Sequence, residues 1–338
     1  MILVTGSTGL VGSHLLVQLC KGNEPVRALY RKNSNLKLVK ELFIYYFGEK
    51  DAEVNFNKIN WVEGDILDVV SLEDVLHDIQ YVYHCAALVS FNKRDYEKLM
   101  KINVEGTANV VNACIDAQIK KLIYVSSTAA VGKDENKLLA ENDKWERYDD
   151  ISNYSISKFL AEQEVWRGIE EGLNAAIVNP CVILGPHDWT KGSTVAFYNV
   201  YKGLKYYTDG ENAVVDVRVV ANAMILLMAS DITKERYLII SENISIKNLL
   251  TKIANAFGTK PPQKSAGRFM VNIARMAEAI RCRITGALPR ITKETTNAAF
   301  KHFSYSNKKF KNLFPDFEMG NADDAIKNSV DFFRKNKM

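Results

Sequence analysis

The first twelve residues constrain the fold of this 338-residue chain more than any other stretch. The apolar run from Ile2 to Val4 is typical of a strand buried on both faces. Glycines follow at positions 6, 9 and 12, and apolar residues recur at helical spacing from His14. In such a unit the first glycine permits a tight turn, the second lets a pyrophosphate approach the backbone, and the third lets the helix pack on the strand. The pattern predicts a dinucleotide site where the free N–H groups at the helix start face the phosphates.

Strand-like and helix-like segments alternate through the first half of the chain, which predicts an α/β fold of the Rossmann type with a doubly wound parallel sheet. After Pro186 the alternation loosens. We therefore expect an NAD(P)-binding domain over residues 1–185, with a returning segment near 212–230, and a smaller, mainly helical substrate lobe over 186–338.

Within this scheme we expect a strand around 216–219 that returns to the main sheet. We also expect a helix over 71–78 capped by Ser71 and Asp74, a long helix over 96–117, and a surface loop over 133–150.

Composition excludes several classes of protein. The net charge of +4 is spread along the chain, and the basic residues near the C-terminus read as a solvated surface. The five cysteines lie far apart without a CxxC pair, and the histidines show no ligand spacing, so neither disulfides nor a metal site is expected. No basic segment precedes the apolar N-terminus, and the run over 219–230 is too short to span a bilayer. We expect a cytoplasmic protein with a small-molecule substrate, no nucleic-acid partner and no membrane span.

A second informative stretch contains Tyr154 and Lys158, which share one face of a predicted helix because they lie four residues apart. A neighbouring ammonium favours the phenolate, and it can bring a phenol with a pKa near 10 into the working range of an acid–base group. An unremarkable pair on a helix surface is the alternative. Ser127 adds weight, because it closes the strand predicted over 121–125 and ligands bind at the carboxyl ends of such strands.

Taken together, these motifs resemble the extended short-chain dehydrogenase/reductase superfamily, the NAD-dependent epimerase/dehydratase-like group, over nearly the whole chain. Within it, the chain is most similar to dihydroflavonol-4-reductase-like and 3β-hydroxysteroid-dehydrogenase-like members. The matching motifs follow one another in the family's order: TGSTGLVG at 5–12, GDI at 64–66, HCAA at 84–87, NVEGTAN at 103–109, the serines before Gly132, the tyrosine–lysine pair, NPCVILGP at 179–186 and VDVR at 215–218.

The resemblance implies a site for catalysis and a site for the cofactor. Ser127, Tyr154 and Lys158 match the catalytic hydroxyl and the catalytic pair, while Asn103 either steadies a helix or a water behind the lysine or is a packing residue. The implied cofactor-binding residues are Gly6, Thr8, Gly9, Leu10, Val11, Gly12, Arg31, Lys32, Asp65, Ile66, Ala86, Ala87, Tyr154, Lys158, Pro180 and Val182.

The end of the second predicted strand bears on the choice of cofactor. An NAD site usually places an acidic residue there, roughly 20 residues past the glycines. This chain has Arg31 and Lys32 instead. A guanidinium can bind a 2′-phosphate with two hydrogen bonds, so we expect NADP(H) rather than NAD(H). The alternative is that both side chains merely project into solvent.

The expected function is hydride transfer between NADP(H) and a ketone or aldehyde, or the corresponding alcohol, of a small to medium, fairly apolar substrate. The specificity-bearing stretches are expected at 193–207 and 264–289. A nucleotide-sugar epimerase or dehydratase with tightly bound NAD is the alternative, with Arg218, Arg268 or Arg281 on the diphosphate. A cofactor-sensing regulator without turnover is a third reading. By analogy with relatives, a homodimer would form through the helices at 96–117 and 152–172.

Overall fold

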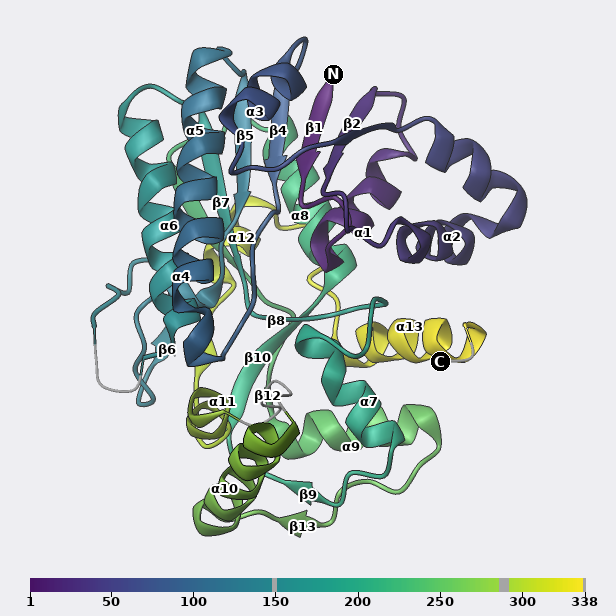
Figure 1. The fold of residues 1–338 in the computed structure, drawn as a ribbon, viewed down its shortest axis with the longest axis vertical. Helices are drawn as coiled ribbons and strands as arrows, with labels where there is room; N and C mark the ends of the chain where they lie inside the picture. The colour runs from purple at the N-terminus through teal and green to yellow at the C-terminus, as the bar shows by residue number, and fades with distance from the viewer. Residues whose placement is uncertain (148–150, 286–291, 337–338) are drawn as a thin grey trace.

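The computed structural model describes residues 1–147, 151–285 and 292–336. These residues form a seven-stranded sheet in the order β11-β7-β5-β4-β1-β2-β3, with every neighbouring pair parallel (Figure 1). The predicted Rossmann-type sheet is confirmed. Its strands are β1 (Ile2–Thr5), β2 (Val26–Tyr30), β3 (Asn60–Glu63), β4 (Tyr81–His84), β5 (Lys121–Val125), β7 (Ala175–Pro180) and β11 (Glu235–Ile239).

Helices cover both faces of the sheet because successive side chains of each buried strand point to opposite sides. On β1, Ile2 and Val4 belong to one apolar core and Leu3 to the other. Figure 1 shows α1, α2 and α8 on one side and α3, α5 and α6 on the other. The bounds are α1 (Leu10–Leu19), α2 (Leu36–Asn57), α3 (Val69–Leu76), α5 (Gly106–Asp116), α6 (Asn153–Glu170) and α8 (Val217–Ala229).

Two helices differ in detail from the sequence prediction. The expected capping pair of Ser71 and Asp74 is wrong, because α3 begins earlier and the Asp68 side chain accepts from the Ser71 amide. An aspartate directly before the helix satisfies an amide that has no intrahelical partner. The long helix predicted over 96–117 consists of α4 (Tyr96–Leu99), a π-helical segment (Met100–Glu105) and α5.

The second half of the chain builds its own core around a sheet in the order β12-β10-β8. Helices from three separate stretches pack around it, including the C-terminal α13. These elements are β8 (Val182–Leu184), β10 (Glu211–Asp216), β12 (Glu242–Ser245), α7 (Val195–Tyr201), α9 (Ile246–Phe257) and α13 (Ala322–Lys335). The domain boundary near 185 remains a prediction.

The strand expected around 216–219 is wrong. The strand β10 ends at Asp216 and pairs with β8 and β12 in the smaller sheet. The Asp216 side chain accepts from the Arg218 amide and starts α8, whose buried residues Val220 and Leu227 join the core that α1 also lines. The strand that returns to the main sheet is β11, which pairs with β7. The apolar run after Asp216 suits a strand or a helix, and the aspartate cap decides for the helix.

The segment predicted as a surface loop over 133–150 contains structured residues. Its short strand β6 (Leu138–Leu139) pairs with β14 (Ser304–Tyr305), and the Glu141 carboxylate accepts from the Leu238 amide at 2.9 Å. Residues 148–150 of this prediction lie outside the described residues. The remaining elements are β9 (Tyr206–Tyr207), β13 (Lys264–Ser265), α10 (Arg268–Thr285), α11 (Lys293–Ala298) and α12 (Lys308–Leu313). Within the described ranges, every helix is too short or too polar to cross a bilayer.

Candidate functional site

The glycine turn after β1 has the geometry that the sequence predicts. Gly6 adopts a φ of +63°, a conformation that favours glycine, and a Cβ on it would collide with the backbone of Cys85 and Ala86. A Cβ on Gly12 would collide with the Gly6 carbonyl, so the third glycine lets α1 start directly against the turn. Gly9 is exposed just before α1. The backbone here can therefore be approached closely from outside, as a pyrophosphate requires.

The start of α1 has no side-chain cap, and its first turn holds no acidic residue. By contrast, Asn35, Asp68 and Ser152 cap α2, α3 and α6 with their side chains. The N–H groups of Leu10 and Val11 fall among those that lack an intrahelical acceptor. An uncapped helix start with exposed Gly9 beside it fits a bound phosphate group, which would supply the missing acceptors.

The residues predicted for the adenosine end lie at neighbouring strand ends. Arg31 and Lys32 are exposed directly after β2. Asp65 is half-buried, and its carboxylate accepts from the Leu67 amide at 3.0 Å. The Ile66 side chain is buried, and its carbonyl accepts from the Asn109 amide nitrogen at 3.1 Å. The Asn109 bond holds the 64–66 loop against α5, at the same sheet edge as the glycine turn.

The predicted catalytic residues Ser127 and Tyr154 come together at the carboxyl end of β5. Burial raises the pKa of the Tyr154 phenol to about 12, and a hydrogen bond with Ser127 partly opposes this rise. The half-buried phenol is therefore protonated at neutral pH in the cofactor-free chain. Burial is the largest cause of this raised pKa, and the expectation that Lys158 brings the phenol into its working range remains a prediction.

Lys158 is fully buried and is held by the sheet beneath the tyrosine. Its Nζ atom donates to the Tyr124 hydroxyl at 2.8 Å and to the Val125 carbonyl at 2.8 Å. Burial lowers the pKa of this amine to about 7, while the Glu162 charge raises it. The Glu162 charge and the two oxygen acceptors favour the ammonium form, which titrates near neutral pH.

A buried chain of hydrogen bonds continues from Lys158 to the strand that carries the glycine turn. The Tyr124 hydroxyl bonds with Thr107, whose Oγ1 atom lies 3.0 Å from His84 Nε2. On the other side of the ring, His84 Nδ1 lies 2.7 Å from Thr5 Oγ1. Burial lowers the pKa of His84 to about 3, so the ring is neutral in the folded chain. Sequence reasoning missed this series of hydrogen bonds, which joins α6, β5, α5, β4 and β1 and has no local spacing pattern.

Asn103 uses its side chain on protein groups. Its Oδ1 atom accepts from the Leu88 amide at 2.7 Å, and its Nδ2 atom donates to the Leu88 carbonyl and to Ser157 Oγ, each at 2.9 Å. These bonds tie the π-helical segment to the loop after β4 and to α6 one residue before Lys158. The geometry fits a positioning residue, which is one of the two roles left open by the sequence.

Phe91 is a neighbour of Tyr154 that the sequence did not indicate. The two rings meet edge to face with centroids 5.6 Å apart, and Phe91 is 38% exposed. Val89, in the same loop, is 52% exposed. Val89 and Phe91 follow Ala86 and Ala87 in the chain, and these two alanines belong to the turn that is predicted to contact the cofactor. The tyrosine therefore has the exposed apolar ring of Phe91 beside it.

A buried ion pair holds the strand ends that carry Ser127 and Pro180. Glu162 is fully buried and accepts from Arg236 at 2.8 Å, from Ser126 Oγ at 2.5 Å and from Asn179 Nδ2 at 2.7 Å. The same Asn179 nitrogen donates to the Ser127 carbonyl at 3.0 Å. Pro180 is buried and Val182 half-buried, next to this pair along the chain. The NP motif thereby fixes the backbone of Ser127.

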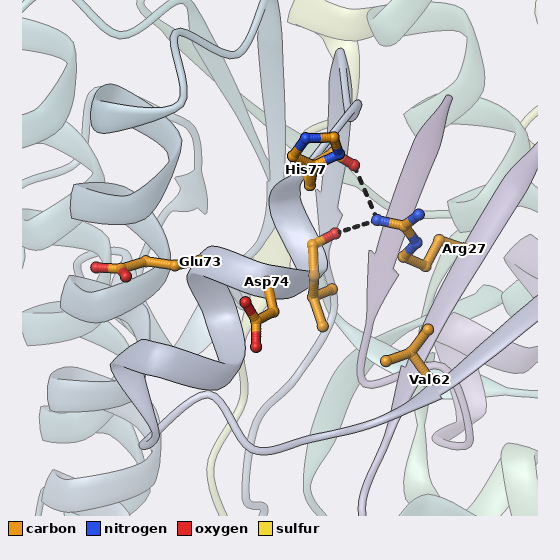
Figure 2. A pocket seen from close by; sticks show the side chains of 6 residues that line it. Arg27, Val62, Glu73, Asp74 and His77 are labelled. Atoms are coloured by element: carbon orange, nitrogen blue, oxygen red, sulfur yellow. Dashed lines mark hydrogen bonds between the residues drawn. The ribbon is translucent and has the colours of Figure 1, made fainter.

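An open cavity of about 520 Å³ lies elsewhere, between β2, β3 and α3 (Figure 2). Arg27 projects from β2, and its Nη1 atom donates to the Val75 and His77 carbonyls at 2.7 and 2.9 Å. A cation on the last carbonyls of a helix stabilises its C-terminus. The polar contacts in this cavity are structural, and none of the predicted site residues lines it.

Comparisons with known proteins agree with this geometry. The model of the NAD-dependent epimerase/dehydratase family matches residues 2–239. The putative dihydroflavonol 4-reductase of Synechocystis sp. is 30% identical over 269 residues, covering 78% of this chain and 74% of that protein. Sterol demethylase protein B of Methylococcus capsulatus is 28% identical over 287 residues, covering 83% and 82%.

The fold is also similar to solved structures. The crystal structure of gox2253 superposes with a TM-score of 0.79 at 28% identity, covering 99% of this chain and 98% of that one. The matched region includes the glycine turn, the tyrosine–lysine pair and the seven-stranded sheet. The chain belongs to the NAD-dependent epimerase/dehydratase family and is an NAD(P)-dependent enzyme of the extended short-chain dehydrogenase/reductase type.

Proposed function

We propose that this enzyme is an NADP-dependent oxidoreductase that reduces a ketone or aldehyde of a fairly apolar substrate, or oxidises the corresponding alcohol. The observation that carries the proposal is the protonated Tyr154 phenol, bonded to Ser127 and flanked by exposed Phe91. A protonated acid beside a second hydroxyl suits a carbonyl oxygen that gains a proton. The relatives named as a dihydroflavonol reductase and a sterol demethylase protein support the choice of an apolar compound.

Each catalytic residue has a distinct task in this proposal. Ser127 donates a hydrogen bond that orients the carbonyl oxygen, and Tyr154 gives its proton to that oxygen as negative charge develops. Lys158 stabilises the phenolate that remains, because its ammonium lies on the same face of α6. The bound nicotinamide would supply the hydride. The apolar side chains of Val89 and Phe91 would contact the substrate and limit access of water.

We extend the proposal to NADP as the preferred cofactor. Arg31 and Lys32 lie exposed just past β2, and Ser7 Oγ ties the glycine turn to this strand by donating to the Leu29 carbonyl at 2.7 Å. The segment from Tyr30 to Asn35 has no carboxylate that would repel a 2′-phosphate. The positive charge beside the turn therefore favours the phosphorylated ribose.

The alternative, a nucleotide-sugar epimerase or dehydratase with tightly bound NAD, needs cations for the sugar diphosphate. The three candidate arginines already have contacts in this structure. Arg218 pairs with buried Asp216 at 2.5 Å, Arg281 pairs with Glu278 at 2.7 Å, and the Arg268 guanidinium lies 5.1 Å from the Phe300 ring centroid. These contacts favour the reductase. The intact Tyr154 and Lys158 also speak against a regulator without turnover.

Cofactor titration of the purified full-length chain tests the proposal. The preparation is first checked for cofactor that co-purifies, and it is then titrated with NADPH and NADH. We expect exchangeable binding with a preference for NADPH, followed by turnover in a screen of apolar ketones and aldehydes. Tightly retained NAD together with turnover of a nucleotide sugar would replace the proposal by the alternative. Absence of binding to both cofactors would overturn it.

Two further predictions concern the residues that set substrate specificity and the contacts between subunits. We expect residues 193–207 and 264–285 to set specificity; the remainder of the predicted stretch 264–289, residues 286–289, lies outside the described residues. A homodimer through α4–α5 and α6 remains a prediction, and sedimentation velocity on the full chain tests it.

A further inference from the structure

The helix α10 exposes an unusual amount of apolar surface. Phe269 is 80% exposed, Met276 63%, Ile280 60%, Ile284 79% and Ile273 51%. Single exposed apolar residues are ordinary on protein surfaces, but a contiguous patch of large ones marks an interaction site. The neighbouring Met270 is also exposed, at 42%. An 18-residue helix with this surface facing water calls for a partner.

These apolar side chains form one stripe. With about 100° of rotation per residue, the six exposed large apolar side chains between Phe269 and Ile284 fall within an arc of about 120° on the helix. Arg283 projects beside one edge of this arc and Arg281 beside the other. Long basic side chains at the edges of an apolar stripe can hold their charges in the polar layer while the stripe inserts below it. The pattern is that of a helix lying in an interface.

The charge of the helix selects among partners. Residues 268–285 contain four arginines and a single acidic residue, Glu278, which pairs with Arg281 at 2.7 Å. Packing against the same helix of a second copy would place arginines opposite arginines. An anionic bilayer surface complements both the apolar stripe and the positive charge. We propose that α10 is an interfacial helix that docks this enzyme on anionic lipid membranes.

The position of α10 connects this surface to the catalytic residues. Figure 1 shows α10 beside α11 in the lower lobe, and the two helices are in contact. The Glu294 carboxylate on α11 accepts from the amide of Asn153, the residue before Tyr154. The lobe that carries α10 therefore lies next to the catalytic tyrosine, and docking through α10 would bring this lobe to the membrane. An apolar substrate could then reach the active site from the bilayer. This consequence rests on the proposed function, whereas the docking of α10 on the membrane does not.

Vesicle sedimentation of the full-length chain tests the docking. The probes are vesicles of phosphatidylcholine with about 30 mol% phosphatidylserine, and vesicles of phosphatidylcholine alone. We expect binding to the anionic vesicles that weakens as salt rises. The triple variant Phe269→Ser, Ile273→Ser, Ile280→Ser should bind at least about tenfold less, because it removes most of the buried apolar area. Arg275→Gln with Arg283→Gln should reduce binding to anionic vesicles selectively.

A matched control separates the helix from general surface hydrophobicity. Val54, Val69 and Val70 are 57%, 49% and 67% exposed on α2 and α3. Their triple substitution by serine should leave vesicle binding unchanged. Circular dichroism and NADPH binding show that each variant is folded, and neither readout depends on the substrate. Equal vesicle binding by the α10 serine variant would overturn the proposal. The proposal would also be overturned if the parent protein were a dimer that the α10 serine variant dissociates. Binding of the parent protein to vesicles of phosphatidylcholine alone, as strong as its binding to anionic vesicles, would overturn it as well.

Discussion

The Nζ atom of Lys158 donates to the Tyr124 hydroxyl, with 2.8 Å between the two atoms. A second bond, to the Val125 carbonyl, has the same length. Both acceptors belong to β5, so the sheet itself positions the buried amine beneath Tyr154. Since burial lowers the pKa of Lys158 to about 7, the loss of one acceptor should change its charge near neutral pH.

Tyr124→Phe should move the pH dependence of turnover without blocking cofactor binding. A hydrogen bond to a charged group contributes about 1.5–3 kcal/mol, so loss of the hydroxyl should lower the pKa of Lys158 by roughly 1–2 units. The limb of kcat/KM that requires the ammonium should shift to lower pH by the same amount. Tyr83→Phe, on the neighbouring strand β4, is the control and should keep the parent profile. An unchanged profile in Tyr124→Phe would remove Tyr124 from the positioning of Lys158.

Tyr154→Phe should reduce kcat between about a hundredfold and ten-thousandfold, the range that a positioned acid–base group contributes. The phenol carries the proton that reduction needs, because burial keeps its pKa at about 12. Dissociation constants for NADPH should change little, since the glycine turn is untouched. Phe91→Leu keeps an apolar neighbour and is the matched control. Turnover by Tyr154→Phe equal to that of the parent would exclude the tyrosine as the proton donor.

Arg31→Ala should weaken NADPH binding by about 1.5–3 kcal/mol, the contribution of hydrogen bonds to a charged group, and should change NADH binding little. Isothermal titration with both cofactors measures the difference. Lys40→Ala removes one exposed positive charge from α2 and controls for net charge. If the two cofactors weaken alike in Arg31→Ala, the guanidinium does not bind the 2′-phosphate.

His14→Leu should make the stability of the protein less dependent on pH. Burial lowers the pKa of His14 from 6.5 to about 3, so the folded chain keeps the ring neutral while the unfolded chain takes up a proton below 6.5. Its contribution is complete above pH 6.5 and is lost as the pH falls towards 3. The free energy of unfolding should decrease by about 2 kcal/mol between about pH 7.5 and pH 5 because of this residue alone.

Urea denaturation at these two pH values measures that decrease. The decrease in the free energy of unfolding should be about 2 kcal/mol smaller in His14→Leu than in the parent. The variant should still lose stability at low pH through His84, whose pKa is also lowered to about 3. His77→Gln substitutes an exposed histidine and should behave like the parent. Equal losses in His14→Leu and the parent would show that the buried ring does not govern acid sensitivity.

Features within one or two elements were predictable from the sequence. The turn at Gly6 and Gly12, the alternation of strands and helices, and the shared helix face of Tyr154 and Lys158 follow from local periodicity and steric limits. The family's ordered motifs extended these predictions along the chain. Where a local pattern was compatible with two structures, as after Asp216, the prediction was wrong because a single cap favoured the helix.

The parallel sheet, the dinucleotide turn and the residue types at the carboxyl ends of the strands follow from the amino-acid order alone, because backbone geometry and apolar spacing act over a few residues. Which atoms meet at those strand ends depends on how distant segments pack in three dimensions. The bond from Lys158 to Tyr124, the ties of Asn103 to Leu88 and the packing of Phe91 on Tyr154 join segments far apart in the chain. Burial, which sets the protonation of Tyr154 and Lys158, depends on the packing of all these segments together.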